Sequence, residues 1–193
     1  MGWNHHSNET RRSTRAKELC RRGELRAESA FREAIRVRPD YTDAHGNLAN
    51  LLSGAGTFGE AQDQFKIALR LRPRDAATRY NYAMLLGRTG HFDEAQRELD
   101  ASLRADPGFA DAHELLGDLL MAKSQAQDAI PHYREALRIK PESSRAHLGL
   151  GAALVAAGDV ASAIPHLRKA GAGPDAATRE QAAEMLRQLG KER

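Results

Sequence analysis

The sequence has few of the residues that build strands, disulfides or membrane spans. Val and Ile together occur 8 times, against 34 Ala and 22 Leu. Because β-branched residues favour strands and Ala and Leu favour helices, this composition disfavours a sandwich, a barrel or a parallel-sheet enzyme. Cys20 is the single cysteine, so an intramolecular disulfide is excluded, which fits a reducing compartment. The longest nearly apolar stretch, 148–157, is too short to cross a bilayer.

The N-terminal residues lack the apolar core of a signal peptide. We therefore expect a cytoplasmic protein without a membrane partner, with the periplasm as the alternative if a signal was removed. Residues 1–41 carry a net charge of +4 and residues 42–193 a net charge of −1. A near-neutral body is a poor match for nucleic acid, so no nucleic-acid partner is expected.

A repeat of 34 residues organises the chain. Four prolines keep this period, and so do five alanines and five large residues: Pro39, Pro73, Pro107 and Pro141; Ala27, Ala61, Ala95, Ala129 and Ala163; Phe31, Phe65, Leu99, Tyr133 and Leu167. Coincidences of this kind at one period mark an array of structural repeats.

Each repeat divides into two helices. In residues 42–75, apolar residues recur at helical spacing on both sides of a glycine-containing break at 54–56. The proline near the end of the repeat terminates the second helix, because it has no backbone N–H and restricts the residue before it. Asp75 and Ser143 stand where the N-cap of the following helix belongs.

The spacing resembles the tetratricopeptide repeat, in which Leu-Gly-x-x-Leu in the first helix is followed by Ala, an aromatic residue or Leu, Ala and Pro. Residues 110–143 match most closely, with Leu116, Gly117, Leu120, Ala129, Tyr133, Ala136 and Pro141. The resemblance implies an all-α fold, a right-handed α-solenoid of helix–turn–helix repeats with a C-terminal capping helix. It leaves the function open, because one fold serves many tasks.

On this register the chain has a basic N-terminal segment with one helix (1–23), the second helix of a partial first repeat (24–41), four repeats (42–75, 76–109, 110–143 and 144–175) and a capping helix (176–193). The chain departs from the family pattern at two places that affect the fold. Ser124 replaces the glycine at one interhelical turn, and the helix expected at 9–22 has Thr14 and Glu18 at apolar positions.

Two patterns that suggest ligand chemistry are better explained by the repeat. Residues 54–59 spell the glycine-rich dinucleotide fingerprint, but that motif needs a preceding strand and here follows a predicted helix. His45, His113 and His147 share one repeat position, and helices stacked about 10 Å apart cannot bring them to one metal ion. We therefore predict no metal, no cofactor and no catalytic residue, and we place these histidines in the helix interface.

The remaining candidate for function is the concave surface that the first helices would form. On the family register this groove contains Asn47, Asn50, Tyr80, Asn81, Met84, Arg88, Glu114, Asp118, Met121, Arg145, Leu148 and Val155. Asn47 and Asn81 are expected to contact a peptide backbone, because an amide both donates and accepts, unless Asn is simply tolerated at an exposed position. Tyr80 would stack on the ligand. Glu114 and Asp118 would bind a basic side chain, and Met121, Leu148 and Val155 an apolar one.

The sequence therefore predicts a non-enzymatic scaffold or adaptor that binds a peptide segment of another protein in its concave groove. One alternative is a structural scaffold that associates with itself through the ends of the array. The other is the repeat region of a larger enzyme or multidomain protein.

Overall fold

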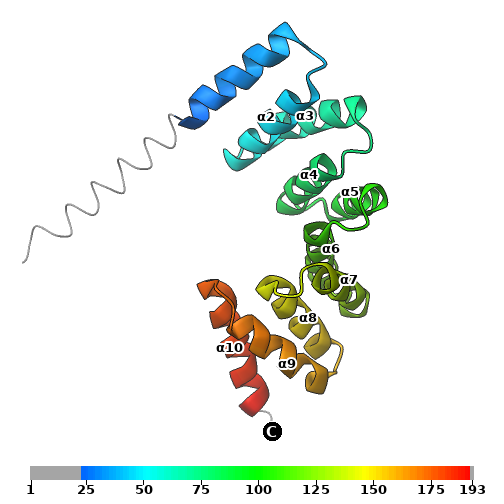
Figure 1. Cartoon of the computed structure of the whole chain (residues 1–193), viewed down its shortest axis with the longest axis vertical. Helices are drawn as coiled ribbons and strands as arrows, with labels where there is room; N and C mark the ends of the chain where they lie inside the picture. Colours follow the sequence, from blue (N-terminus) through cyan, green and yellow to red (C-terminus); the bar gives the residue numbers. More distant parts are fainter. Residues whose placement is uncertain (1–22, 192–193) are drawn as a thin grey trace, which may run out of the picture. The chain divides into compact units, whose positions relative to one another are not determined.

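Helices account for the regular secondary structure in the computed structural model, which describes residues 23–191 (Figure 1). The chain forms two units, Met1–Pro73 and Arg74–Arg193. The first has a helical segment at 23–37, α2 (Thr42–Gly54) and α3 (Phe58–Leu71). The second has α4 (Ala76–Arg88), α5 (Phe92–Ala105), α6 (Ala110–Ala122), α7 (Ala126–Ile139), α8 (Ser144–Ala156), α9 (Val160–Gly171) and α10 (Ala176–Lys191). The helix expected at 9–22 and Cys20 lie outside the described residues.

In the first unit, α2 packs on α3. Leu48 on α2 and Phe65 on α3 are each only 1% exposed, as the helical spacing of the apolar residues predicts. Arg32 in the segment 23–37 pairs with Glu60 on α3 at 2.6 Å, but both side chains are more than a third exposed, so this pair contributes little stability. Because α2 continues to Gly54, a helix precedes the glycine-rich stretch 54–59, which is the wrong context for a dinucleotide site.

The second unit consists of three helix pairs and a final helix. α4 packs on α5, α6 on α7 and α8 on α9, and α10 contacts both α8 and α9. The first helices of successive pairs also contact one another, α4 with α6 and α6 with α8, and α10 continues this row. In Figure 1, α4, α6, α8 and α10 form one row of this unit, and α5, α7 and α9 form the other.

Short polar side chains fix where α4 and α8 begin. The Thr78 backbone N–H donates to Asp75 Oδ1 at 3.0 Å, and the Ala146 N–H donates to Ser143 Oγ at 3.2 Å. Both residues are therefore N-caps, as the sequence predicted. Asp175 caps α10 in the same way, since its Oδ2 accepts from the Thr178 N–H at 2.7 Å.

The turns between paired helices require a left-handed residue. Gly56, Gly90 and Gly158 have φ angles of 83°, 81° and 86°, and Ser124 has a φ of 60° at the equivalent place. Glycine adopts this conformation without the Cβ clash that other residues meet. The departure from the family pattern at Ser124 therefore keeps the turn but carries local backbone strain.

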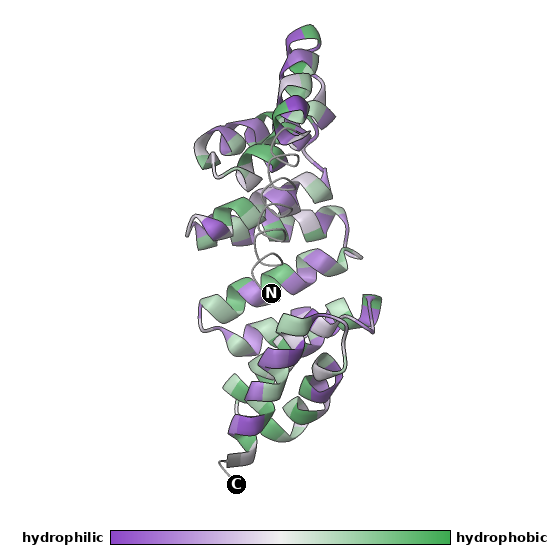
Figure 2. Cartoon of the chain, turned by 90° about the vertical axis from the view of Figure 1, so that its left-hand side faces the viewer, coloured by the Kyte–Doolittle hydropathy of each residue, from purple (hydrophilic) through white to green (hydrophobic). Residues whose placement is uncertain are grey.

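These observations confirm the fold class, an all-α solenoid of helix–turn–helix repeats. Figure 2 shows polar and apolar residues along the same helices, as expected where each helix buries one stripe. α10 buries Ala182 completely and leaves Arg179, Glu180 and Glu184 exposed. Such a polar outer face is what the terminal helix of a repeat array needs.

Candidate functional site

Arg145 connects α8 with α6 through two predicted groove residues. Its Nε forms an ion pair with Glu114 Oε1 at 2.7 Å, and its Nη2 donates to Asp118 Oδ2 at 2.7 Å. The second oxygen of each carboxylate has its own donor: Ser143 Oγ donates to Glu114 Oε2 at 3.0 Å, and the Tyr133 hydroxyl donates to Asp118 Oδ1 at 2.7 Å. We call these five residues the Arg145 cluster. The two carboxylates, expected to receive a basic side chain from a ligand, thus already hold one from the chain itself.

Local structure explains the geometry of this cluster. Glu114 and Asp118 are four residues apart on α6, so they share one face of the helix. Arg145 lies in the first turn of α8, beside the N-cap Ser143. The Ser143 hydroxyl therefore has two roles, because it accepts from the first turn of α8 and donates to Glu114 on α6.

Tyr133 reaches this surface from the second helix α7. Its ring lies against the backbone of Gly117 on α6 and of Gly149 on α8. A Cβ added at Gly149 would lie 2.3 Å from Cε1 of the ring, and one at Gly117 would lie 2.7 Å from Cζ. Glycine at these two positions therefore makes room for the ring, and the hydroxyl reaches Asp118.

Burial dominates the electrostatics of the cluster. Glu114 is only 8% exposed, and burial raises the pKa of its carboxyl, although Arg145 and Ser143 act in the opposite direction. Burial also raises the pKa of the Tyr133 hydroxyl, and the negative charge of Asp118 adds to this effect. Tyr133 is therefore protonated at neutral pH and donates its hydrogen bond.

Tyr80 lies on α4, which contacts α6, as α8 with Arg145 also does. Its ring centroid is 5.0 Å from that of Phe109. Burial raises the pKa of its hydroxyl, and the nearby Asp111 carboxylate acts in the same direction. Asp111 is held in turn by Lys140 at 2.7 Å. Part of the Tyr80 ring is thus already packed against the chain, which reduces the surface it has for stacking on a ligand.

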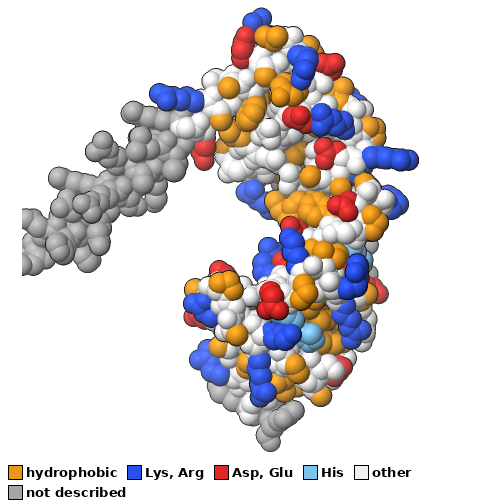
Figure 3. Space-filling model, in the orientation of Figure 1, with side chains coloured by type: hydrophobic (Ala, Val, Ile, Leu, Met, Phe, Trp, Pro, Cys, Tyr) orange, Lys and Arg blue, Asp and Glu red, His pale blue; other side chains and the backbone are white. Residues whose placement is uncertain are grey.

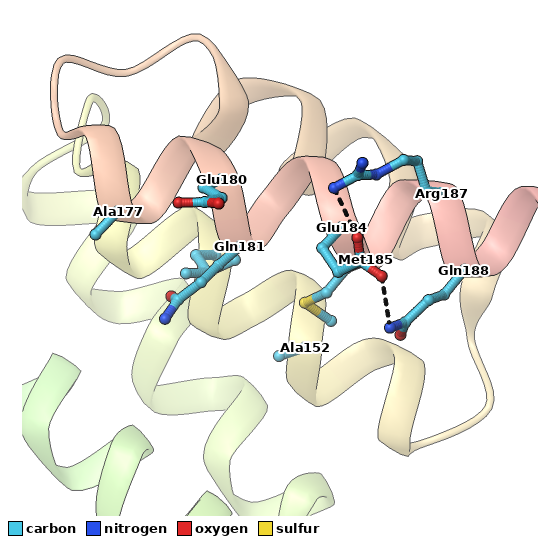
Figure 4. A pocket seen from close by; sticks show the side chains of 9 residues that line it. Ala152, Ala177, Glu180, Gln181, Glu184, Met185, Arg187 and Gln188 are labelled. Carbon is cyan, nitrogen blue, oxygen red and sulfur yellow. Dashed lines mark hydrogen bonds and ion pairs between the residues drawn. The ribbon is translucent and has the colours of Figure 1, made fainter.

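A pocket of about 590 Å³ lies between α8 and α10 (Figure 4). Leu148 and Ala152 line it from α8. The lining from α10 consists of Ala177, Glu180, Gln181, Glu184, Met185, Arg187 and Gln188. In Figure 4, the Met185 side chain extends from α10 toward Ala152. The pocket therefore has an apolar side formed by both helices and polar side chains along α10.

The structure brings some of the predicted groove residues together. Tyr80, Glu114, Asp118 and Arg145 interact electrostatically on one surface, and Leu148 lines the pocket. The others are exposed (Asn47 and Asn50 on α2 of the first unit, Met84 and Arg88 on α4) or half-buried (Asn81, Met121 and Val155). Their contacts with a ligand remain predictions.

The sequence pattern predicted α10 as a capping helix and not as part of the groove. The signal was the spacing of the N-caps: Asp175 follows Ser143 by 32 residues, two fewer than the repeat period. A register shifted by two residues places Gln181 at the position of Gly149, which is also the position of Asn47 and Asn81. Because the last repeat is two residues shorter, the 34-residue period does not align the Gln181 amide with those of Asn47 and Asn81.

Histidines in two helix pairs bond across the pair. The Nδ1 atoms of His113 and His132 are 3.3 Å apart, and those of His147 and His166 are 3.0 Å apart. His113 and His147 lie on the first helix of their pairs, and the Nε2 atom of each contacts the carbonyl oxygen of a proline. Because a carbonyl only accepts, Nε2 carries the proton, and the facing imidazole donates to Nδ1.

In the other two helix pairs, different combinations of side chains occupy the positions of these histidines and also interact across the pair. In the first unit, His45 Nδ1 lies 2.7 Å from Gln64 Oε1, and in α4 and α5 an ion pair joins Arg79 and Glu98. The shared position is thus a link between paired helices, as predicted. Among residues 23–191, no group of three or more His, Cys, Asp or Glu side chains is placed to hold a metal ion.

Two further observations concern the charge of the surface and the apolarity of the helices. Figure 3 shows acidic and basic side chains interspersed over the face in view. Of the helices in the described part of the chain, none combines the length and apolarity needed to cross a membrane.

Paired helices repeated every 34 residues, with the first helices of the second unit in one row and its second helices in another, define a helix–turn–helix repeat protein. A family model described as tetratricopeptide repeat matches residues 25–76, 47–86, 83–144 and 119–177. The chain belongs to the tetratricopeptide repeat family. The resemblance carried by its prolines, alanines and aromatic residues is confirmed.

Solved structures of other repeat proteins are similar to this chain. MamA matches with a TM-score of 0.73 and 20% identity, over 87% of this chain and 95% of that chain. The pilF protein of Pseudomonas aeruginosa matches with a TM-score of 0.75 and 20% identity, over 91% of this chain and 87% of that chain. YrrB is described as a tetratricopeptide repeat protein with an unusual peptide-binding site. It matches with a TM-score of 0.67 and 24% identity, over 81% of this chain and 89% of that chain. At these identities the likeness shows the fold alone. No curated protein matches the sequence significantly.

Proposed function

We propose that this protein is an interaction scaffold that binds a peptide segment of another protein on the row formed by α4, α6, α8 and α10. The repeats and their structural relatives support an interaction scaffold in general. The observation that carries the proposal is the pocket between α8 and α10. Its volume of about 590 Å³ is typical of ligand sites, which span about 300–1,000 Å³.

The Arg145 cluster supports this role by holding the row together. It joins α6 to α8 through the Arg145–Glu114 ion pair and the charge-assisted hydrogen bond from Arg145 to Asp118, so the surface beside the pocket is fixed before a ligand arrives. Such preorganisation lowers the entropy that binding costs. The Arg145 side chain is 61% exposed and its Nη1 is not used by the carboxylates, so it is available to donate to a peptide carbonyl. The peptide-binding site attributed to YrrB gives the proposal a precedent within the fold.

Selection of random peptides displayed on phage tests the proposal. The wild-type protein would be compared with Ala152→Leu, which narrows the pocket, and with Ala161→Leu, a matched change at an exposed position of α9. We expect selected peptides to bind the wild type and Ala161→Leu equally, and Ala152→Leu about tenfold more weakly. Equal binding to all three proteins would place the peptide elsewhere, and failure to recover any peptide would contradict the proposal.

A further inference from the structure

The α8–α10 pocket joins an apolar surface to a carboxylate. Leu148 and Ala152 on α8 and Met185 on α10 supply the apolar part. Glu180 lies one turn before Glu184 on the same helix, and both carboxylates line the pocket. An occupant must therefore cover apolar atoms and remain compatible with negative charge.

The two carboxylates differ in what they already bind. Glu184 pairs with Arg187 at 2.6 Å and accepts from Gln188 Nε2 at 3.0 Å, as the dashed lines in Figure 4 mark. Glu180, in contrast, has no hydrogen-bond or ion-pair partner among the described residues. The lining thus carries one negative charge in excess, and this charge is on the residue that is free to pair.

This arrangement discriminates among side chains. A purely apolar side chain would cover Met185 but would remove water from Glu180 without replacing the lost hydrogen bonds, which is unfavourable. An acidic side chain would be repelled. Arginine or lysine meets both demands, because its aliphatic stem lies along apolar atoms while its charged head reaches a carboxylate. Gln181 on the same helix can pair with the backbone of the segment that carries this side chain.

We propose that the α8–α10 pocket selects a partner segment by a basic side chain, with the stem of that side chain on Leu148, Ala152 and Met185 and its charged head at Glu180. This inference rests on the proposed function, which it makes specific. The partner would present an arginine or lysine in an extended segment, flanked by residues that contact the rest of the row.

Nuclear magnetic resonance titration with short peptides tests the inference. The probes are acetyl-Leu-Arg-Leu-amide, the same peptide with citrulline, which has nearly the shape of arginine without its charge, and the same peptide with glutamate. We expect the arginine peptide to shift the amide signals of Ala152, Gln181 and Met185, and the other two to bind at least threefold more weakly. Glu180→Gln should weaken binding of the arginine peptide about threefold, the size of an exposed ion pair.

Glu94→Gln is the matched control, because it removes one exposed carboxylate from α5, outside the pocket lining. It should leave binding of the arginine peptide unchanged. Equal binding of the citrulline and arginine peptides, or an equal effect of Glu94→Gln and Glu180→Gln, would overturn the selection for a basic side chain. If phage-selected peptides still depended on Ala152, the proposed function would stand without this specificity. If they did not, the proposed function itself would fail.

Discussion

The Arg145 cluster and the α8–α10 pocket belong to the same row of helices but are built in opposite ways. In the cluster, every carboxylate oxygen has a hydrogen-bond or ion-pair partner, and the ring of Tyr133 leaves no room for a Cβ at Gly149. In the pocket, about 590 Å³ of space remains and Glu180 has no partner among the described residues. The charged residues that stand out in the sequence therefore hold the helices in place, and the capacity for a ligand lies beside them.

The largest expected effect is steric and belongs to the cluster. Gly149→Ala places a Cβ 2.3 Å from the Tyr133 ring, so we expect a loss of about 3 kcal/mol in the free energy of unfolding, the upper part of the range for overpacking. Urea unfolding followed by circular dichroism measures it. The control is Gly87→Ala in α4, where a Cβ meets nothing within 4 Å and should gain about 0.5–1 kcal/mol. Similar effects of the two substitutions would refute the tight packing of the cluster.

Removing one polar group from the Arg145 cluster and one from the α8–α10 pocket should have smaller and unequal effects on the free energy of unfolding. Tyr133→Phe removes the donor to Asp118 and should cost about 1.5 kcal/mol, as expected for a hydrogen bond to a charged acceptor. Glu180→Gln changes a carboxylate without a partner, so its effect on unfolding should stay within about 0.5 kcal/mol. The same urea experiment compares both. A greater loss from Glu180→Gln than from Tyr133→Phe would reverse the assignment of structural and ligand-binding roles.

The helix pair that supplies Tyr133 has a turn that can be improved. Ser124→Gly should stabilise the protein by about 0.5–1 kcal/mol, because glycine relieves the strain at a φ of 60°. Gly90→Ala, at the equivalent turn with a φ of 81°, should destabilise it by about 1 kcal/mol. Thermal unfolding by calorimetry would detect both. A decrease in stability with Ser124→Gly would show that the serine side chain contributes more than its backbone strain removes.

The least effect is expected from pH, and it arises in the paired histidines. Burial lowers the pKa of His132, His147 and His166 below their ordinary value of 6.5. The unfolded chain therefore binds these protons at higher pH than the folded chain does. Their contribution to stability is complete above about pH 6.5 and is lost as the pH falls through the folded pKa values.

Urea midpoints at pH 7.5 and pH 5.5 check this direction. The variant with His132→Gln and His166→Gln copies the His–Gln link of the first unit, where His45 faces Gln64. Its midpoint should change less with pH than that of the wild type. A wild-type midpoint that rises on acidification would contradict the expected sign.

The fold could be predicted because its signals are local. The 34-residue period, the prolines and the N-caps Asp75 and Ser143 act through neighbouring residues, and the structure confirms them. Ser124 shows the same logic, since a turn that needs a left-handed residue keeps it even without glycine.

The site was less predictable because it depends on contacts between helices. The register placed Glu114, Asp118 and Arg145 on one surface, but it did not show that they satisfy one another. Likewise, the repeat period singled out Tyr133, but its hydroxyl bond to Asp118 depends on glycines on two other helices. The α10 part of the pocket was missed because the last repeat is two residues shorter.

A crystal structure of the protein with a phage-selected peptide would test the central claim most directly. The account predicts electron density for the peptide along α6, α8 and α10, with one side chain between Leu148 and Met185, and an Arg145 cluster unchanged from the free protein. Density over α5, α7 and α9, or an Arg145 that leaves Glu114 and Asp118 to admit a ligand base, would contradict the division between structural cluster and ligand pocket.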